Sequence, residues 1–173
     1  HWPHGRKRVG KVRDIYDEGE SLVLVATDRL SAFDRAITTI PYKGQVLNQL
    51  SAWWFSQTQA MCNNHVVKVL AANAMRVQKC TLIPVEFVVR AYITGSTNTS
   101  LWHHYEQGAR VYCGHRFADG LRKNQRLAQP ILTPTSKDAI HDEPMSAQAI
   151  IARGWLSAKE WAQAEACVLA LFA

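Results

Sequence analysis

One arginine inside an apolar stretch is the first candidate for chemistry. Residues 84–96 have the sequence PVEFVVRAYITGS, and from Val85 on they alternate at period two, as in a mostly buried strand. Glu86 and Arg90 share one face of that strand but lie roughly 13 Å apart at about 3.3 Å per residue, so neither can neutralise the other directly. A fixed guanidinium beside the turn Thr-Gly-Ser is suited to hold an anion. The alternative is an edge strand whose arginine pairs with a neighbouring carboxylate.

A glycine between basic residues is the second candidate. Gly10 precedes Lys11 and Arg13 in a run of strand formers, residues 6–16, and the acidic turn 17–20 leads to an apolar strand at 21–27. A glycine in such a hairpin can bring backbone N–H groups and an ammonium to a phosphate. The spacing is not that of a Walker loop, and a solvated basic strand is the alternative.

Composition limits the class of protein. The 173 residues are 47% hydrophobic and 20% charged, which is typical of a globular protein, and the formal net charge of +6 favours anionic partners, either nucleic acid or small phosphorylated molecules. The apolar runs are too short for a membrane span, and nothing resembles a secretory signal, so we expect a cytoplasmic protein. His103, His104 and His115 lack the H-E-x-x-H spacing, and no metal-ligand set is predicted.

The elements that must position these residues are strands first and helices later. A polar loop is predicted at 28–35, and a helix at 44–63 whose Trp53 and Trp54 are expected to be core residues. Two strands at 66–70 and 75–82 precede the strand of Arg90. Ser157 and Glu160 have capping-box spacing at the start of the last helix. The order indicates an α+β fold with a largely antiparallel sheet.

Six segments, taken in order, resemble the SAICAR synthetase family of de novo purine biosynthesis. They are GKVRDIYD (10–17), ATDRLSAFD (26–34), KGQVLNQLS (43–51), PVEFVVRAYITGS (84–96), PILTPTSK (130–137) and HDE (141–143). The resemblance implies an ATP-dependent carbon–nitrogen ligase that joins L-aspartate to carboxyaminoimidazole ribotide (CAIR), giving SAICAR, ADP and phosphate. It also implies a two-lobed fold, with an antiparallel β-rich nucleotide-binding lobe at 1–90 and the start of an α/β second lobe for substrate and ATP at 91–173.

The resemblance also implies roles for individual residues. The nucleotide would contact Gly10, Lys11, Val12, Arg13, Leu82 and Glu86. The ribotide and aspartate would contact Ser31, Asp34, Arg90, Ser96, Lys137, His141 and Asp142. Lys11, Lys137 and Asp142 would take part in catalysis, because an acyl phosphate intermediate needs charged groups around the transferring phosphoryl group.

The chain departs from the family pattern at its end. Family members continue into segments resembling DTKYEFG and DEVHTPDSSRYW, which supply carboxylates for Mg²⁺, and neither occurs in this sequence. ATP and Mg²⁺ are thus the expected cofactors, with the metal ligands outside the chain. We therefore expect a C-terminally incomplete chain with negligible synthetase activity by itself.

Two other hypotheses stay open. One is a truncated, inactive fragment that retains part of the nucleotide and ribotide site. The other is a basic nucleic-acid-binding module, favoured by the charge of residues 110–126 but disfavoured because only Tyr112 and Phe117 are interleaved there. The expected partners are ATP, CAIR and L-aspartate, without nucleic acid or membrane, and homo-oligomerisation is left open.

Overall fold

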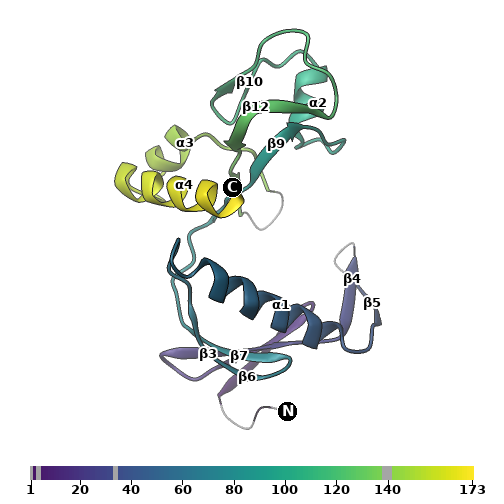
Figure 1. Ribbon diagram of the computed structural model, residues 1–173, viewed down its shortest axis with the longest axis vertical. Coiled ribbons are helices and arrows are strands. Elements are labelled where there is room, and N and C mark those ends of the chain that lie inside the picture. Colours follow the sequence, from purple (N-terminus) through teal and green to yellow (C-terminus); the bar gives the residue numbers. More distant parts are fainter. Residues whose placement is uncertain (1, 3–4, 33–34, 138–141) are drawn as a thin grey trace. The chain divides into compact units, whose positions relative to one another are not determined.

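The chain forms two compact units. The computed structural model describes residues 2, 5–32, 35–137 and 142–173. One unit comprises residues 1–81 and the other residues 82–173, here called the N-terminal and C-terminal units (Figure 1). The boundary expected at residue 90 falls inside β9 (Val89–Ile93), which pairs with the later strand β12 (Gln125–Leu132). That pairing brings the whole segment from Leu82 on into the C-terminal unit.

An antiparallel sheet forms the N-terminal unit. Its strands, in spatial order, are β1 (Arg6–Val9), β2 (Arg13–Asp17), β3 (Ser21–Ala26), β7 (Ala74–Gln78) and β6 (Val66–Ala71). The predicted hairpin across 17–20 is present as β2–β3. The prediction of one strand over residues 6–16 is wrong, because the chain turns at Gly10 and these residues form a hairpin of their own. Tyr16, Val23 and Val77 are buried on the sheet.

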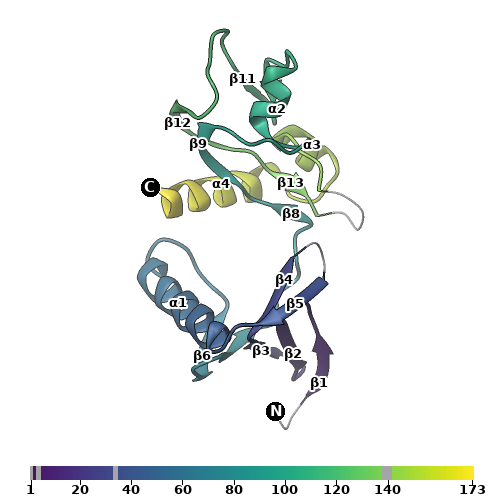
Figure 2. The ribbon, with the colours of Figure 1, turned by 90° about the vertical axis from the view of Figure 1, so that its right-hand side faces the viewer.

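The segment that follows β3 was predicted as a loop, and this prediction is wrong. Residues Arg29–Ala32 form β4 and Arg35–Thr39 form β5, an antiparallel hairpin apart from the main sheet (Figure 2). Its residues are too polar for the apolar alternation by which buried strands are recognised, and every described residue of β5 is exposed.

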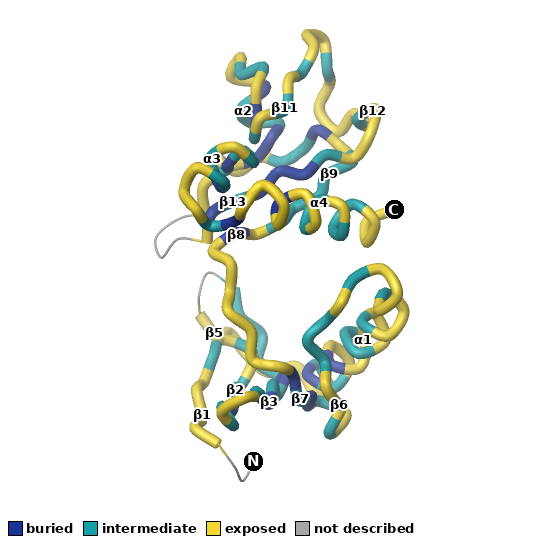
Figure 3. Tube along the Cα trace, turned by 90° about the vertical axis from the view of Figure 1, so that its left-hand side faces the viewer, coloured by how far each residue is buried: buried dark blue, intermediate teal, exposed yellow. Residues whose placement is uncertain are grey.

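Helix α1 (Lys43–Thr58) lies against the main sheet, and its buried residues are small or polar. Only Gly44 and Asn48 are buried in it (Figure 3), and Asn48 donates to the carbonyl oxygens of Ala71 and Ala72. Trp53 and Trp54 are 52% and 55% exposed, so the prediction that they are core residues is wrong. The helical spacing was correct, but the side of the helix that faces the sheet is set by Gly44 and Asn48.

The C-terminal unit combines short strand pairs with three helices. Besides β9 and β12, its elements are β8 (Val85–Glu86), α2 (Leu101–Glu106), β10 (Val111–Tyr112), β11 (His115–Arg116), β13 (Thr135–Ser136), α3 (Ala147–Ala152) and α4 (Ala158–Phe172). The single strand predicted from Val85 on, within residues 84–96, is interrupted at Phe87–Val88, where its partner changes from β13 to β12. All strand pairs between described residues are antiparallel, which confirms the α+β class.

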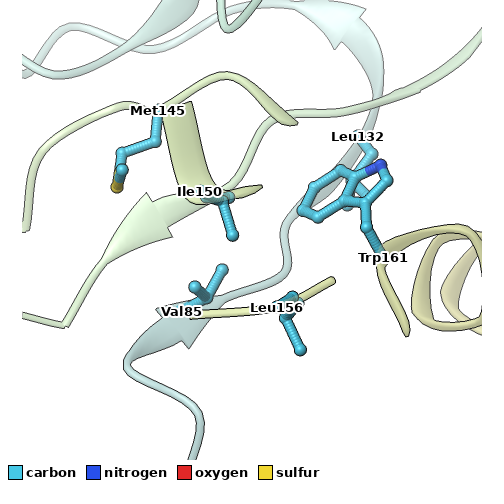
Figure 4. Packing of buried hydrophobic residues seen from close by; sticks show 6 residues of the cluster. All are labelled: Val85, Leu132, Met145, Ile150, Leu156 and Trp161. Atoms are coloured by element: carbon cyan, nitrogen blue, oxygen red, sulfur yellow. The ribbon is translucent and has the colours of Figure 1, made fainter. Parts of the chain in front are cut away.

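Two apolar clusters stabilise the C-terminal unit. The first consists of Val85, Leu132, Met145, Ile150, Leu156 and Trp161 (Figure 4). The Trp161 ring also stacks on Phe87, with ring centroids 5.6 Å apart. The second cluster consists of Ile93, Leu101, Tyr105 and Tyr112. The first cluster thus joins α3 and α4 to the strands that carry Arg90 and its neighbours.

The start of α4 follows the predicted capping box. The Ser157 hydroxyl accepts a hydrogen bond from the Glu160 backbone N–H (3.2 Å), and the Glu160 carboxylate accepts one from the Ser157 N–H (2.8 Å). The Ser157 hydroxyl also donates to the Glu160 carboxylate at 2.7 Å, and this bond, followed by the one from the Ser157 N–H, lowers the pKa of Glu160. Among the described residues, no helix is both long enough and apolar enough to cross a bilayer.

The Trp161→Ala substitution is expected to destabilise the C-terminal unit. Trp161 is 7% exposed, and removing a buried aromatic ring leaves a cavity that costs about 3–5 kcal/mol. Urea unfolding followed by far-UV circular dichroism measures this loss. Leu171→Ala, on the same helix but 43% exposed, is the matched control and should cost about 0.5 kcal/mol or less. Equal losses in the two variants would contradict the packing described for Trp161.

Candidate functional site

The loop that joins β1 to β2 is tight and centred on Gly10. The Gly10 N–H donates to the Arg13 carbonyl oxygen at 2.7 Å. A Cβ atom at Gly10 would lie 3.0 Å from that same oxygen, a contact so tight that a larger residue would require the turn to shift by a few tenths of an ångström. Lys11 is exposed in the loop, and the predicted phosphate-binding residues Gly10, Lys11, Val12 and Arg13 are contiguous at one end of the sheet.

Arg29, at the start of β4, spans this loop from one side. Its Nη2 donates to the Gly10 carbonyl oxygen (3.0 Å) and its Nε to the Lys11 carbonyl oxygen (3.1 Å). The same Nη2 also donates to the Asp14 carboxylate at 2.7 Å. Thr27 binds the next carbonyl oxygen, that of Val12, through its N–H (3.1 Å) and its hydroxyl (2.9 Å).

Asp14 is the charged group that anchors Arg29. Its other carboxylate oxygen is 2.8 Å from the Lys7 ammonium, and its side chain is only 14% exposed. Burial alone would raise the pKa of Asp14, but the hydrogen bonds from Lys7 and Arg29 outweigh burial and lower it. The carboxylate is therefore charged at neutral pH and holds two cations near the loop.

Asp28 connects the same segment to α1. Its carboxylate accepts hydrogen bonds from the N–H groups of Tyr42 (3.2 Å) and Gly44 (2.9 Å), which lie at the N-terminus of the helix. A Cβ at Gly44 would collide with the Ala26 carbonyl oxygen, so only glycine lets the helix begin this close to β3. The three consecutive residues Thr27, Asp28 and Arg29 thus fix both the hairpin loop and the start of α1.

A small cavity lies between α1 and the sheet. Its volume is about 130 Å³, and it is lined by Val12, Arg13, Leu24, Ala26, Leu47, Asn48, Ser51, Phe55, His65 and Met75. Burial, followed by the charge of Arg13, lowers the pKa of His65. The lowered pKa favours the neutral imidazole, so His65 adds no positive charge to that of Arg13 at neutral pH.

In the C-terminal unit, a neutral side chain orients Arg90. The Nε of Arg90 donates to the Thr133 hydroxyl oxygen at 2.9 Å, and that hydroxyl donates to the Val88 carbonyl oxygen at 3.1 Å. Thr133 is 1% exposed. The strand β9 is an edge strand, paired only with β12 among the described residues, but within this part of the chain Arg90 has no ion pair with a carboxylate, so the pairing that the alternative requires is not observed there.

Lys137, in the same unit, forms ion pairs with two carboxylates. Its ammonium is 3.4 Å from Glu86 and 3.5 Å from Asp142. The charge of Glu86, and then that of Asp142, raises the pKa of Lys137. Glu86 and Arg90 therefore have different partners, as their separation along the strand predicted.

The other predicted site residues fall in both units. Ser31 is in β4 of the N-terminal unit, Ser96 is exposed in the loop after β9, and the Leu82 side chain is 89% exposed. Asp34 and His141 lie outside the described residues. Their predicted contacts with nucleotide or substrate stay predictions.

Several residues that hold the site were not identified from the sequence. Asp14, Thr27, Asp28, Arg29 and Thr133 act on loops and backbone groups that are distant in sequence. All five fall inside the segments 10–17, 26–34 and 130–137 that carry the family resemblance. Their position in these segments was the signal by which they could have been identified as candidate site residues.

Comparisons with known proteins agree on one family. A family model described as SAICAR synthetase matches residues 7–173. A phosphoribosylaminoimidazole-succinocarboxamide synthase of Legionella pneumophila is 54% identical over 170 residues, which is 98% of this chain and 54% of the relative. The chloroplastic enzyme of the same name from Arabidopsis thaliana is 53% identical over 163 residues, covering 94% of this chain and 40% of the relative.

Solved structures resemble the fold. The SAICAR synthase of Saccharomyces cerevisiae, described as complexed with SAICAR, superposes with a TM-score of 0.78 at 32% identity, over 95% of this chain and 60% of that one. A type-2 SAICAR synthetase in complex with ADP superposes with a TM-score of 0.73 at 21% identity, over 96% of this chain and 65% of that one, a likeness of fold. The chain spans about half the length of the curated Legionella relative.

The ion pairs of Asp14 predict a defined pH dependence. Because its pKa is lowered in the folded state, these pairs stabilise the fold above the ordinary value of 3.8, and the stabilisation is lost as the pH falls through the folded-state pKa. Asp14→Asn should unfold more easily than wild type at pH 7, by about 1–3 kcal/mol.

Urea unfolding of both proteins at a series of pH values measures the difference. It should be constant from pH 7 to pH 5 and shrink below pH 3.8. A difference that stays constant to pH 2 would show that the Asp14 carboxylate is not stabilised by Lys7 and Arg29.

Proposed function

The chain belongs to the SAICAR synthetase family, and on that premise we propose that it carries nucleotide-binding and ribotide-binding parts of an ATP-dependent ligase of purine biosynthesis. The ligase joins L-aspartate to CAIR and releases SAICAR, ADP and phosphate. The observation that carries the proposal is Arg90, a guanidinium oriented by the buried Thr133 and without an ion pair among the described residues. A cation held in this way is suited to bind an anionic ligand.

The reaction needs an activated carboxylate. The γ-phosphoryl group of ATP would pass to a carboxylate oxygen of CAIR, and ADP would leave. The amine of aspartate would then attack the carbonyl carbon, phosphate would leave, and the new amide nitrogen would lose a proton. Each step develops negative charge on phosphoryl or carbonyl oxygens, which fixed cations stabilise.

Different residues of this chain would bind the nucleotide, the ribotide and the aspartate. Lys11, in the Gly10–Arg13 loop, would face the nucleotide phosphates, and Arg90 with Ser96 would bind the ribotide. Lys137 lies between Glu86 and Asp142 and can direct its ammonium to an incoming substrate anion in exchange for one of them. Ser31 and Asp34 would border the ribotide, and His141 with Asp142 would border CAIR and aspartate. Leu82 and Glu86 would lie near the adenine.

Mg²⁺ is the expected companion of ATP in phosphoryl transfer, but the described residues do not form a site for it. Among them, no group of three or more histidine, cysteine, aspartate or glutamate side chains is arranged to hold a metal ion. Asp14, Asp28 and Glu86 are already engaged with cations or with backbone N–H groups. We therefore derive no step of the reaction through a metal held by this chain.

The nucleic-acid hypothesis gains no support from the basic segment 110–126. Arg110, its first residue, pairs with Asp119 at 2.6 Å and lies over the Tyr105 ring, 4.1 Å from its centroid. The charge of Arg110 is thus engaged in contacts within the C-terminal unit. A cytoplasmic location stays a prediction, since the Arabidopsis relative is named chloroplastic, and homo-oligomerisation also stays untested.

Binding calorimetry of the 173-residue chain with ADP and with SAICAR tests the proposal. Lys11→Ala should weaken ADP binding by about tenfold or more and leave SAICAR binding unchanged, because a charge-assisted contact to phosphate is worth about 1.5–3 kcal/mol. Arg90→Ala should do the reverse, weakening SAICAR binding by a similar factor.

Two exposed basic residues serve as matched controls. Lys68→Ala in β6 and Arg116→Ala in β11 remove the same charge away from the proposed contacts and should change neither affinity. Failure of wild type to bind either ligand, together with salt-dependent binding of a single-stranded RNA, would favour the nucleic-acid hypothesis instead.

A further inference from the structure

All three carbonyl oxygens of the Gly10–Val12 loop are bound by the segment that follows β3. Arg29 donates to the carbonyl oxygens of Gly10 and Lys11, at 3.0 and 3.1 Å. Thr27 donates to that of Val12 through both its N–H (3.1 Å) and its hydroxyl (2.9 Å). The loop is therefore held through its carbonyl oxygens, on the side that faces Thr27 and Arg29.

The orientation of a carbonyl fixes that of the next N–H. The peptide bonds between described residues are not cis, and in a trans peptide the C=O of one residue and the N–H of the following residue point in opposite directions. With the Gly10 and Lys11 carbonyls directed at Arg29, the N–H groups of Lys11 and Val12 are directed away from it. Successive N–H groups on one side of a loop form an anion-binding concavity, whereas a carbonyl turned to that side would repel an anion.

We propose that Arg29 is a positioning residue for nucleotide binding, which holds the loop carbonyls back so that the Lys11 and Val12 N–H groups face the phosphates. The inference deepens the proposed function and rests on the part of it that assigns ATP to this loop. In this role the Nε and Nη2 of Arg29 are engaged with the loop and with Asp14 rather than with the nucleotide.

The surroundings of Arg29 keep it in this place. Asp14 holds Nη2 at 2.7 Å and is itself paired with Lys7, and the Lys43 ammonium donates to the Arg29 carbonyl oxygen at 3.1 Å. The Arg29 side chain is 27% exposed, so its contacts are partly shielded from water. Moving it toward a phosphate would break three hydrogen bonds and leave the Asp14 carboxylate with one cation fewer.

Lysine cannot replace Arg29 in this role. The planar guanidinium presents donors in a rigid fork, which here reaches two carbonyl oxygens and a carboxylate at once. An ammonium is a single centre on a flexible stem, and it would satisfy Asp14 while releasing one or both carbonyls. Arg29→Lys thus keeps the charge and removes the restraint on the loop.

The test is the affinity of Arg29→Lys for a series of adenine ligands that differ in phosphate number. Calorimetry of the full 173-residue chain should show ADP binding weakened by about tenfold, AMP binding weakened less, and adenosine binding unchanged. SAICAR affinity should equal that of wild type. Arg35→Lys, on the exposed strand β5, makes the same exchange away from the loop and should change no affinity.

A second pair of variants keeps the inference testable if Arg29→Lys is poorly folded. Thr27→Val removes the hydroxyl that binds the Val12 carbonyl oxygen at nearly constant shape, and Thr27→Ser retains it. Thr27→Val should show a smaller loss that likewise grows with phosphate number, and Thr27→Ser should bind as wild type does.

The outcomes separate this inference from the proposed function. Equal losses for adenosine and ADP, or an unchanged ADP affinity in Arg29→Lys and Thr27→Val while Lys11→Ala still weakens binding, would overturn the role of Arg29 alone. Absence of ADP binding by wild type would overturn the nucleotide assignment and this inference with it.

Discussion

Three consecutive residues, Thr27, Asp28 and Arg29, hold both the Gly10–Val12 loop and the start of α1 by hydrogen bonds. Thr27 and Arg29 bind the Gly10–Val12 loop, and Asp28 binds the first N–H groups of α1. A loop of exposed glycine and lysine has little apolar surface to bury, so hydrogen bonds must supply its order. Because one short segment acts on both the loop and the helix, displacement of either is transmitted to the other.

The two units hold their arginines in different ways. Arg29 faces the carboxylate of Asp14, which compensates its charge, whereas Arg90 is held by the neutral hydroxyl of Thr133. A compensated guanidinium contributes geometry, while an uncompensated one keeps its full attraction for an anion. The carboxylate partner therefore suits Arg29 to shape a site, and the neutral partner suits Arg90 to bind a ligand.

Local patterns in the sequence were sufficient wherever neighbours in the chain decide the structure. The hairpin across 17–20, the capping box of Ser157 and Glu160, and the α+β class are of this kind. The exposure of Trp53 and Trp54 could not be predicted in this way, because helical periodicity locates an apolar stripe but not what covers it. The side of α1 that meets the sheet is chosen instead by Gly44 and Asn48.

The candidate site shows the same division. The separate partners of Glu86 and Arg90 follow from strand spacing, whereas the turn at Gly10 that divides residues 6–16 into two strands was not predicted. The residues that bind the loop carbonyls do not follow from strand spacing, since Arg29 is 19 residues from Gly10 and its contacts are with backbone oxygens, which leave no trace in side-chain pattern. Thr133 is 43 residues from Arg90 and was missed for the same reason.

The interruption between β8 and β9 constrains how this segment can change in evolution. At the break, the Val88 carbonyl oxygen accepts from both the N–H (2.8 Å) and the hydroxyl (3.1 Å) of Thr133, the residue that orients Arg90. Side chains alternate along a strand, so inserting or deleting one residue between Glu86 and Arg90 would turn the guanidinium to the opposite face. Exchange of one apolar side chain for another leaves this geometry in place, whereas the gain or loss of one residue would separate Arg90 from Thr133.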